Sequence, residues 1–333
     1  MCGRCRQNAS ASDLSEQCSN QLNGKSSGSS SSSGKSHDRG DDVSRSYTEK
    51  ERSDDVSIEQ QQQQQQHVVS WKDEKERARY DPRENVTPGS NMAVLLRTNE
   101  RTHLVSMKWG LVPSYVKSRK DVNHWKMFNA RSETVLSNGV FSRLVEKRRC
   151  AIPMNGFYEW QTLSNGKKQP FYLTLKRDSC DHLIYAAGLY DIWIDRITDE
   201  KLYTFTILTM DACVSIFNWL HERQPVLLNT RSALGKWLDC ENISSNLALK
   251  EARFEGSQID LTFNPVTHRM TNPKYQGKDC SRHVDESSSS IKKWFSKKRN
   301  RPETPTPSPK KKTKKKKKKM GIERFFSPSP KKQ

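Results

Sequence analysis

The middle of the chain, from about Trp71 to Val266, is patterned mainly like β-strands. Its apolar residues alternate with polar ones or form short continuous runs, and turn residues such as Ser164-Asn165-Gly166 separate the runs. Strands predominate and do not alternate strictly with helices, so we expect an α+β fold with a mostly antiparallel β-sheet system. The expected strands are Met92–Arg97, His103–Trp109, Arg148–Ile152, Gly156–Trp160, Phe171–Leu175, Leu183–Trp193, Leu202–Met210 and Leu261–Val266.

Three stretches have the patterns of short helices. Asp13–Gln21 begins with a residue that can cap a helix and carries Glu16 three positions later. Asp211–Leu220 also opens on an acidic residue, and Arg231–Leu238 has apolar residues at helical spacing. We therefore expect helices interspersed among the strands.

Two long segments lack any such pattern. Ser26–Ser33 is almost entirely serine and glycine, and Gln60–Gln66 is a glutamine tract. Segments of this composition bury too little apolar surface to offset the entropy of ordering the chain. Repeated prolines and a lysine run follow His283, and they indicate that the end of the chain is disordered as well. We expect one catalytic domain made of residues 1–21 and 71–283, a disordered insertion at 22–70 and a disordered basic tail at 284–333.

The composition narrows the class of function. Only 32% of the 333 residues are hydrophobic and the formal net charge is +20, which favours a polyanionic partner such as nucleic acid. No run of about 18 apolar residues is present to span a membrane, and the first residues contain no apolar signal region. The cysteines are scattered along the chain, so we expect reduced thiols in the cytosol or nucleus.

The first residues, Met1-Cys2-Gly3-Arg4, carry the candidate chemistry. Removal of Met1 is expected before a residue as small as Cys2, and it would leave an α-amine and a thiol on one residue. The amine can condense with an aldehyde to an imine, and the thiol can then close a thiazolidine ring. The α-amine has a reference pKa of roughly 7.7–8.0, so a usable fraction is nucleophilic at pH 7. Cys2 and Cys5 lack regularly spaced partners for a zinc site, and we expect no metal.

Four further motifs follow the N-terminal one in order. They are Trp109-Gly110-Leu111-Val112-Pro113, Phe128-Asn129-Ala130-Arg131-Ser132-Glu133, Gly156-Phe157-Tyr158-Glu159-Trp160 and His221-Glu222-Arg223-Gln224-Pro225. Together the five motifs resemble the SRAP (SOS response-associated peptidase) family, over Met1–Gln21 and about Trp71–Val266. Eukaryotic members of that family are abasic-site processing proteins that shield abasic sites in single-stranded DNA. The resemblance implies a thiazolidine crosslink between Cys2 and the aldehyde of the opened deoxyribose, without metal or organic cofactor. It also implies self-removal of Met1 or reversal of the crosslink by the same residues.

The resemblance assigns three more residues to the chemistry. Glu159 is the implied acid and base, and a carboxylate that shares a strand face with an aromatic residue such as Phe157 is expected to have a raised pKa. Asn129 is implied to hold the amine or thiol of Cys2, and His221 to donate a hydrogen bond to the opened sugar hydroxyl or to move a proton. Apart from the resemblance, Glu159 could equally pair with an arginine at a strand end, and His221 could stabilise the end of a helix.

Three residues are candidates for DNA contacts. Arg4 and Arg131 suit bidentate contacts to phosphate, and Trp160 suits stacking on a base beside the abasic gap. The alternatives are ordinary surface positions for the arginines and a core position for Trp160. Two departures from the family pattern lie near these residues: Cys5 stands where bacterial relatives usually have an aromatic residue, and Gln224 stands where the family has methionine.

Two short boxes in the tail resemble the interaction box of the sliding clamp (PCNA). In that box an aliphatic residue precedes two adjacent aromatic residues by three positions, so that all three enter one pocket. The alternatives are chance spacing or another partner on which the tail folds. The run Lys310–Lys319 favours nuclear localisation or nucleic-acid binding, so we expect the protein in the nucleus, on chromatin at replication forks. The boxes consist of Ile322, Phe325 and Phe326, and of Ile291, Trp294 and Phe295.

Together these features predict a sensor and shield of abasic sites in single-stranded DNA, which crosslinks to them through Cys2 by lyase-like chemistry during the DNA damage response. One rival hypothesis is a cysteine peptidase that acts on proteins or on itself, with Cys2 as nucleophile and His221 as base. Another is a non-catalytic reader of modified DNA bases. A crosslinking assay with aldehyde-bearing DNA separates the first rival from the prediction, and full function of a Cys2→Ala protein would support the second.

Overall fold

The computed structural model describes residues 3–24, 68–99, 101–176, 182–214, 217–228 and 230–284. All of them belong to one unit, Met1–Val284. The predicted nucleophile Cys2 and the clamp-binding boxes at Ile291–Phe295 and Ile322–Phe326 lie outside the described residues. The predicted insertion is described only at its two ends and the predicted tail only at Val284, so the domain organisation stays a prediction.

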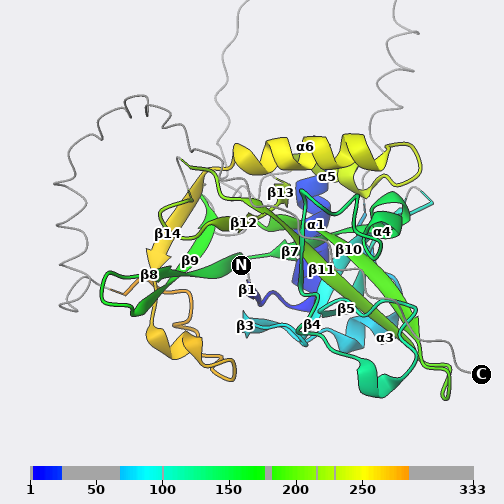
Figure 1. Cartoon of the computed structure of the whole chain (residues 1–333), viewed down its shortest axis with the longest axis horizontal. Helices are drawn as coiled ribbons and strands as arrows, with labels where there is room; N and C mark the ends of the chain where they lie inside the picture. The colour runs from blue at the N-terminus through cyan, green and yellow to red at the C-terminus, as the bar shows by residue number, and fades with distance from the viewer. Residues whose placement is uncertain are drawn as a thin grey trace, which may run out of the picture. The chain divides into compact units, whose positions relative to one another are not determined.

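Two β-sheets form the framework of the described part of the chain (Figure 1). Their strands pair antiparallel except β2 with β5, β5 with β11 and β6 with β11, which confirms the predicted α+β class. The larger sheet contains β2 (Ser70–Trp71), β4 (Asn91–Thr98), β5 (Arg101–Trp109), β6 (Asn129–Arg131), β7 (Arg149–Met154), β10 (Ile184–Ile194), β11 (Lys201–Asp211), β12 (Arg223–Pro225) and β13 (Leu227–Leu228). The smaller sheet contains β1 (Arg4–Gln7), β3 (Arg83–Val86), β8 (Gly156–Thr162), β9 (Lys168–Leu175) and β14 (Leu261–Pro265).

Short helices are interspersed among the strands, as the sequence predicts. In Figure 1, α6 runs along one side of the larger sheet with α5 next to it. In the described part of the chain, no helix has the length and apolar character needed to cross a membrane. The helices are α1 (Ala11–Leu22), α3 (Glu74–Arg79), α4 (Ser142–Lys147), α5 (Arg231–Leu238) and α6 (Ser245–Ser257), with 3-10 turns η1 (Arg119–Asp121) and η2 (His268–Thr271).

Two details of the predicted helices are wrong. The cap of α1 is Ser10, whose Oγ accepts from the backbone N–H of Asp13 at 3.2 Å, because the capping side chain precedes the helix and reaches its third residue. The predicted helix at Asp211–Leu220 does not begin at Asp211, because that residue still pairs with Arg223 as the last residue of β11. The described residues 217–220 after it form hydrogen-bonded turns.

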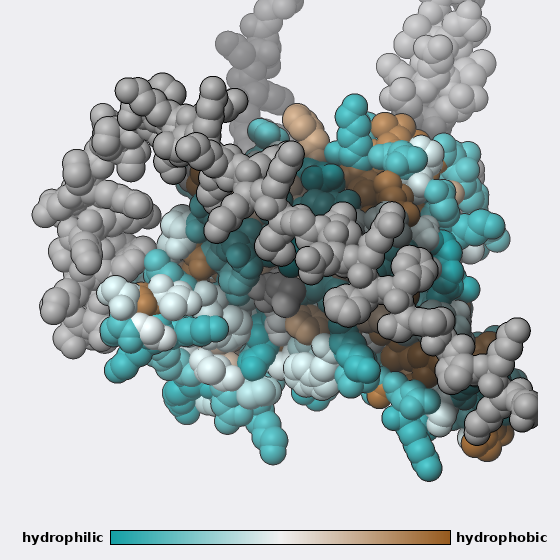
Figure 2. Space-filling model, in the orientation of Figure 1, coloured by the Kyte–Doolittle hydropathy of each residue, from teal (hydrophilic) through white to brown (hydrophobic). Residues whose placement is uncertain are grey.

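The main core lies between the helices and one face of the larger sheet. Leu95 and Leu104 face it from β4 and β5, and Trp237 of α5 donates from its indole N–H to the carbonyl of Cys150 at 2.8 Å. The smaller sheet packs on the opposite face, where the thiol of Cys5 lies 3.7 Å from the sulfur of Met92. Cys5 is fully buried and is therefore a core residue of this interface. Figure 2 shows that hydrophilic residues cover most of the described surface on the face in view.

Gly110 allows the loop after β5 to pack closely. Its φ is 108°, and a Cβ at this position would collide with the backbone carbonyl oxygen of His124.

We expect Gly110→Ala to lower the free energy of unfolding by about 3 kcal/mol or more, because the strained backbone and the backbone collision add together. Urea denaturation measures this loss. Gly89→Ala is the matched control, since Gly89 has a φ of 88° but nothing within 4 Å of a Cβ, and an equal loss in both variants would contradict the collision.

Candidate active site

Strand β1 pairs with the first residues of β8. Arg4 pairs with Tyr158 and Cys5 with Phe157 in an antiparallel register. Continued by one residue, the same register brings Gly3 to Glu159. Cys2 itself lies outside the described residues. The described start of β1 therefore pairs next to the predicted acid and base, Glu159.

The carboxyl group of Glu159 is buried among apolar side chains. The residue is only 3% exposed, and its neighbour across the β8–β9 ladder is Phe171. Burial disfavours the charged carboxylate and raises the pKa of Glu159, although the backbone N–H of Trp160, 3.3 Å from Oε1, and the charge of Lys168 act in the opposite direction. The raised pKa agrees with the expectation from the sequence. Glu159 can therefore hold a proton at a higher pH than an ordinary glutamate.

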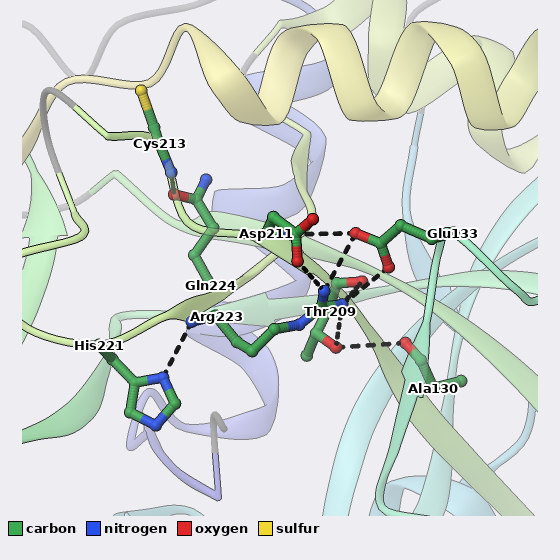
Figure 3. A network of polar contacts seen from close by, with 8 residues as sticks. All are labelled: Ala130, Glu133, Thr209, Asp211, Cys213, His221, Arg223 and Gln224. Carbon is green, nitrogen blue, oxygen red and sulfur yellow. Dashed lines mark hydrogen bonds and ion pairs between the residues drawn. The ribbon is translucent and has the colours of Figure 1, made fainter. Parts of the chain in front are cut away.

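His221 ends a turn that begins at Phe217, whose carbonyl accepts from the backbone N–H of His221 at 3.3 Å. The backbone N–H of Arg223 donates to Nδ1 of His221 at 2.9 Å (Figure 3). An Nδ1 atom that accepts carries no proton, so the neutral ring bears its proton on Nε2. Burial lowers the pKa of His221, which favours this neutral form. The ring is thus prepared to donate one hydrogen bond from Nε2.

An aromatic cluster joins the strand of Glu159 to the turn of His221. Phe157 stacks on Phe217 with ring centroids 6.3 Å apart, and Phe171 meets Trp219 edge-on at 5.3 Å. Trp219 also contacts Phe263 of β14 at 5.2 Å. These rings supply the apolar surroundings that keep Glu159 poorly solvated. The cluster combines residues from β8, β9 and β14 with the turn before β12, a combination that no local pattern predicts.

Asn129 begins β6, where it pairs with Ile207 of β11. The preceding motif fixes this position: the indole N–H of Trp109 donates to the carbonyl of Phe128 at 2.9 Å, and the backbone N–H of Leu111 donates to Met127 at 3.0 Å. Trp109 is fully buried. Its motif therefore acts on the site through the backbone of the segment that carries Asn129, whose side chain is half-buried.

A buried arginine connects the second and fourth internal motifs. Figure 3 shows Arg223 pointing to Glu133 and Asp211 on the side away from His221. Its Nη2 donates to Oε2 of Glu133 at 2.9 Å and to the carbonyl of Thr209 at 2.9 Å, and its Nη1 pairs with Glu133 and Asp211. This network fixes the backbone N–H that orients His221. The sequence analysis did not predict this network. The opposite charges of Glu133 and Arg223, which stand in two of the family motifs, could have indicated the ion pair.

Gln224 forms a polar link next to Arg223. Its Oε1 accepts from the backbone N–H of Cys213 at 2.9 Å, and its Nε2 donates to the carbonyl of Gly256 at 2.7 Å. The side chain therefore ties the loop after β11 to the end of α6. His221 lies next to the Arg223 network, since the backbone N–H of Arg223 donates to its Nδ1 atom.

We expect Glu133→Gln to lower the free energy of unfolding by about 1–3 kcal/mol, because the buried guanidinium of Arg223 loses a charged partner. Burial alone would raise the pKa of Glu133, but the hydrogen bonds and charge of Arg223 outweigh it, and the pKa is lowered. A lowered pKa adds stability above the unfolded-state value near 4.3, and that stability is lost as the pH falls through the folded-state value. The difference between wild type and variant should therefore shrink in acid. Denaturation at several pH values measures it, and a constant difference would contradict the ion pair.

The three predicted DNA contacts differ in their surroundings. Arg4 donates to Oδ1 of Asn85 at 3.0 Å and to the carbonyls of Met270 and Thr271, both at 3.1 Å, and its guanidinium lies 5.8 Å from the ring centroid of Trp160. Arg4 thus ties β1 to η2. Trp160 is half-buried and packs against the cluster around Tyr158 and Tyr172. Arg131 is exposed at the end of β6.

Sequence reasoning missed two exposed aromatic residues in the segment that leads to Asn129. Tyr115 is 59% exposed and Trp125 is 62% exposed. Exposed lysines alternate with them, including Lys117 and Lys126. Aromatic rings among cations are typical of single-strand binding surfaces, and this spacing was available in the sequence. In the part of the chain that the structure describes, no group of three acidic, histidine or cysteine side chains could hold a metal ion.

Comparisons with known proteins agree with these motifs. The profile of the SRAP family, SOS response associated peptidase, matches residues 1–273. The abasic site processing protein HMCES of Xenopus tropicalis is 30% identical over 236 residues, which cover 63% of this chain and 68% of that protein. HMCES of Gallus gallus is 32% identical over 228 residues, covering 61% and 66%. This chain thus spans about two thirds of the length of these two vertebrate relatives.

A bacterial relative and a solved structure extend the comparison. The abasic site processing protein YoaM of Bacillus subtilis is 33% identical over 198 residues, which cover 60% of this chain and 83% of that protein. A crystal structure of a protein from Bacteroides thetaiotaomicron matches with a TM-score of 0.54 and 22% identity, covering 64% of this chain and 90% of that one. At this level of identity, the structural match shows that the two proteins share a fold.

Proposed function

The chain belongs to the SRAP family, and on that premise we propose that it processes abasic sites in DNA, the activity for which its relatives are named. In the specific form of the proposal, the mature chain begins at Cys2 and binds the site covalently in single-stranded DNA. It thereby senses and shields the damage. The observation that supports this best is the register of β1 on β8, which leads from Arg4 toward the buried acid Glu159.

The crosslink needs no reactant beyond the aminothiol and the sugar. Neutral Glu159 donates a proton to the ring oxygen of the deoxyribose while the anomeric hydroxyl gives its proton to solvent water, so the ring opens to the aldehyde and Glu159 regains a proton from the solvent. The Cys2 amine adds to the aldehyde carbon, and loss of one water gives an imine. The Cys2 sulfur then bonds to the imine carbon, and the thiol proton passes to the nitrogen. The products are a thiazolidine and one water.

His221 and Asn129 have supporting roles in this proposal. The Nε2–H of neutral His221 donates to the hydroxyl that ring opening releases, a role that suits its lowered pKa and the occupied Nδ1 atom. The amide of Asn129 both donates and accepts, so it can orient the amine or thiol of Cys2. Exposed Arg131, two residues further along β6, suits a phosphate contact beside the site.

Single-stranded DNA is the proposed substrate because the aromatic residues near Asn129 need unpaired bases. Tyr115 and Trp125 are exposed and stand among lysines. Stacking of a base on such a ring contributes about 1–3 kcal/mol and is blocked when the base is stacked in a duplex. Trp160 is half-buried and contacts Arg4, so in this proposal only the exposed part of its ring can stack on a base.

Intact-mass spectrometry tests the proposal directly. The protein is incubated with a single-stranded oligonucleotide that carries one abasic site, and the adduct is weighed before and after heating. We expect a chain that lacks Met1 and an adduct equal to protein plus oligonucleotide minus one water, stable to heat. An oligonucleotide whose abasic sugar is reduced to the alcohol is the control and should give no adduct. A mature chain that retains Met1 but still crosslinks would refute the role of the Cys2 amine.

Two parts of the proposal concern segments outside the described residues. The boxes at Ile291–Phe295 and Ile322–Phe326 are proposed to bind the sliding clamp, and the lysine run to direct the protein to the nucleus and to replication forks. A pull-down with the purified clamp should weaken when Phe325 and Phe326 are both replaced by alanine, and should lose its signal when Trp294 and Phe295 are replaced as well. If the peptidase hypothesis held instead, unrelated peptides would be cleaved at a rate that falls with Cys2→Ala while no DNA adduct forms.

A further inference from the structure

The smaller sheet covers only one end of the second face of the larger sheet. Residues opposite each other in antiparallel strands share a face of the sheet. Met92 is opposite Met107, and Leu96 is opposite His103. Met92 and Leu96 are four residues apart on β4, so both pairs lie on this second face. Met92 contacts Cys5 of β1 and is buried there. Further along β4, the same face opens into a groove.

The groove has a volume of about 940 Å³ and runs across the ends of β4, β5, β10 and β11 beside β2. Lys72 and Arg101 stand on its walls and are exposed. Among the described residues that line it, no side chain is a carboxylate. The larger sheet forms the base of the groove, and two exposed cations stand on its walls. The described residues that line it contribute no negative charge, so the lining is net positive.

The polar groups of the groove are of the types that contact phosphate oxygens. The hydroxyls of Ser70, Thr98 and Thr102 line it beside the two cations. The ammonium of Lys72 lies 5.1 Å from the ring centroid of Tyr203 and donates to its hydroxyl at 3.3 Å, which holds the cation at the groove wall. A chain of phosphates would accept hydrogen bonds from several of these donors and pair with both charges at once, which an aliphatic or neutral ligand cannot do.

We propose that this groove is a second binding site for single-stranded nucleic acid, which holds phosphates of the strand through Lys72 and Arg101. The groove lies apart from the candidate active site. Tyr203 lines the groove, and Thr209 belongs to the Arg223 network. These two residues are six positions apart on β11, which corresponds to about 20 Å. The groove recognises the phosphate backbone and not the damaged sugar. Its binding therefore does not depend on the aldehyde chemistry of Cys2.

The test uses the full chain and an intact single-stranded oligonucleotide without an abasic site. Lys72→Glu/Arg101→Glu should weaken binding about tenfold or more at low salt, and should reduce the slope of log K against log salt by about 1.4, because each phosphate contact on a single strand contributes about 0.7. The control, Lys250→Glu/Arg253→Glu on α6, makes the same charge change at two exposed cations and should weaken binding at most about twofold. Thermal unfolding checks that both variants fold.

A second measurement locates the strand. Ultraviolet crosslinking followed by peptide mass spectrometry should find nucleotides on the peptides that carry Tyr190 or Tyr203, which both line the groove. Equal loss of binding in both double variants, or crosslinks that avoid these peptides, would overturn the proposal. Displacement of the crosslinks by polyglutamate as efficiently as by unlabelled oligonucleotide would also overturn it, because the groove would then recognise charge and not phosphate.

Discussion

Cys2→Ala protein is expected to give no heat-stable adduct with abasic single-stranded DNA, a loss of at least about 1,000-fold in yield relative to wild type. The reason is chemical: alanine retains the amine, so an imine can form, but it has no sulfur to close the ring, and an imine hydrolyses readily. Cys2→Ser should behave similarly, because its oxygen ring is far less stable in water. Denaturing gels after heating measure the yield.

Two further results decide how the Cys2 prediction is understood. Borohydride should trap the imine of the Cys2→Ala protein, which shows that the variant folds and binds the sugar. Cys5→Ala is the matched control: Cys5 is fully buried against Met92 and three residues from Cys2, so it should retain the crosslink. Full protection of abasic DNA by Cys2→Ala protein would favour the non-catalytic reader of modified bases.

Glu159→Gln is expected to slow crosslink formation by about 100-fold or more, within the range that general acid–base catalysis contributes. Glutamine has nearly the same shape but cannot donate a proton to the sugar ring oxygen or accept one from the amine. Burial raises the pKa of Glu159, so the wild-type rate should change around a pH above that of an ordinary glutamate, and this step should be absent in the variant. Single-turnover rates from pH 4 to pH 8 measure both effects.

The stability of the same variant separates catalysis from folding. A carboxyl group with a raised folded-state pKa adds stability below the unfolded-state pKa, and this stability is lost as the pH rises through the folded-state value. Glu159→Gln removes that loss, so the variant should be as stable as wild type, or more stable, at pH 7. A variant that is both slow and strongly destabilised would point to a structural role in the β8–β9 ladder. Phe157→Leu, on the same strand face, is a control that should reduce stability more than rate.

Much of the sheet could be predicted because its long strands carry their own pattern. The expected strand Met92–Arg97 is found as β4 (Asn91–Thr98), and the expected helix Arg231–Leu238 is α5. Short strands were missed: β6 has three residues and pairs with β11 only because the Trp109 motif fixes the segment before it. Helix α6 was missed too, since few of its residues are large and apolar.

The sequence proposed members for the candidate site and gave no information about their contacts. Motif order selected Glu159, Asn129 and His221 as candidates, and the aromatic neighbours of Glu159 correctly predicted a raised pKa. The phosphate contact predicted for Arg4 stays a prediction; the structure shows in addition that its guanidinium donates to carbonyl groups of η2, one of them 266 positions away. A local pattern carries no information about a partner at that distance.

The sequence by itself determined which groups this protein can offer: a thiol at Cys2, a carboxyl group among aromatic residues and a large positive charge. These properties depend on residue type and on near neighbours. The tertiary structure alone decided that Arg223 pairs with Glu133, that Nδ1 of His221 accepts from the backbone, and that one end of the large sheet is left open as a basic groove. Each of these depends on strand pairing between distant segments, and the free energy of that pairing comes from the whole fold.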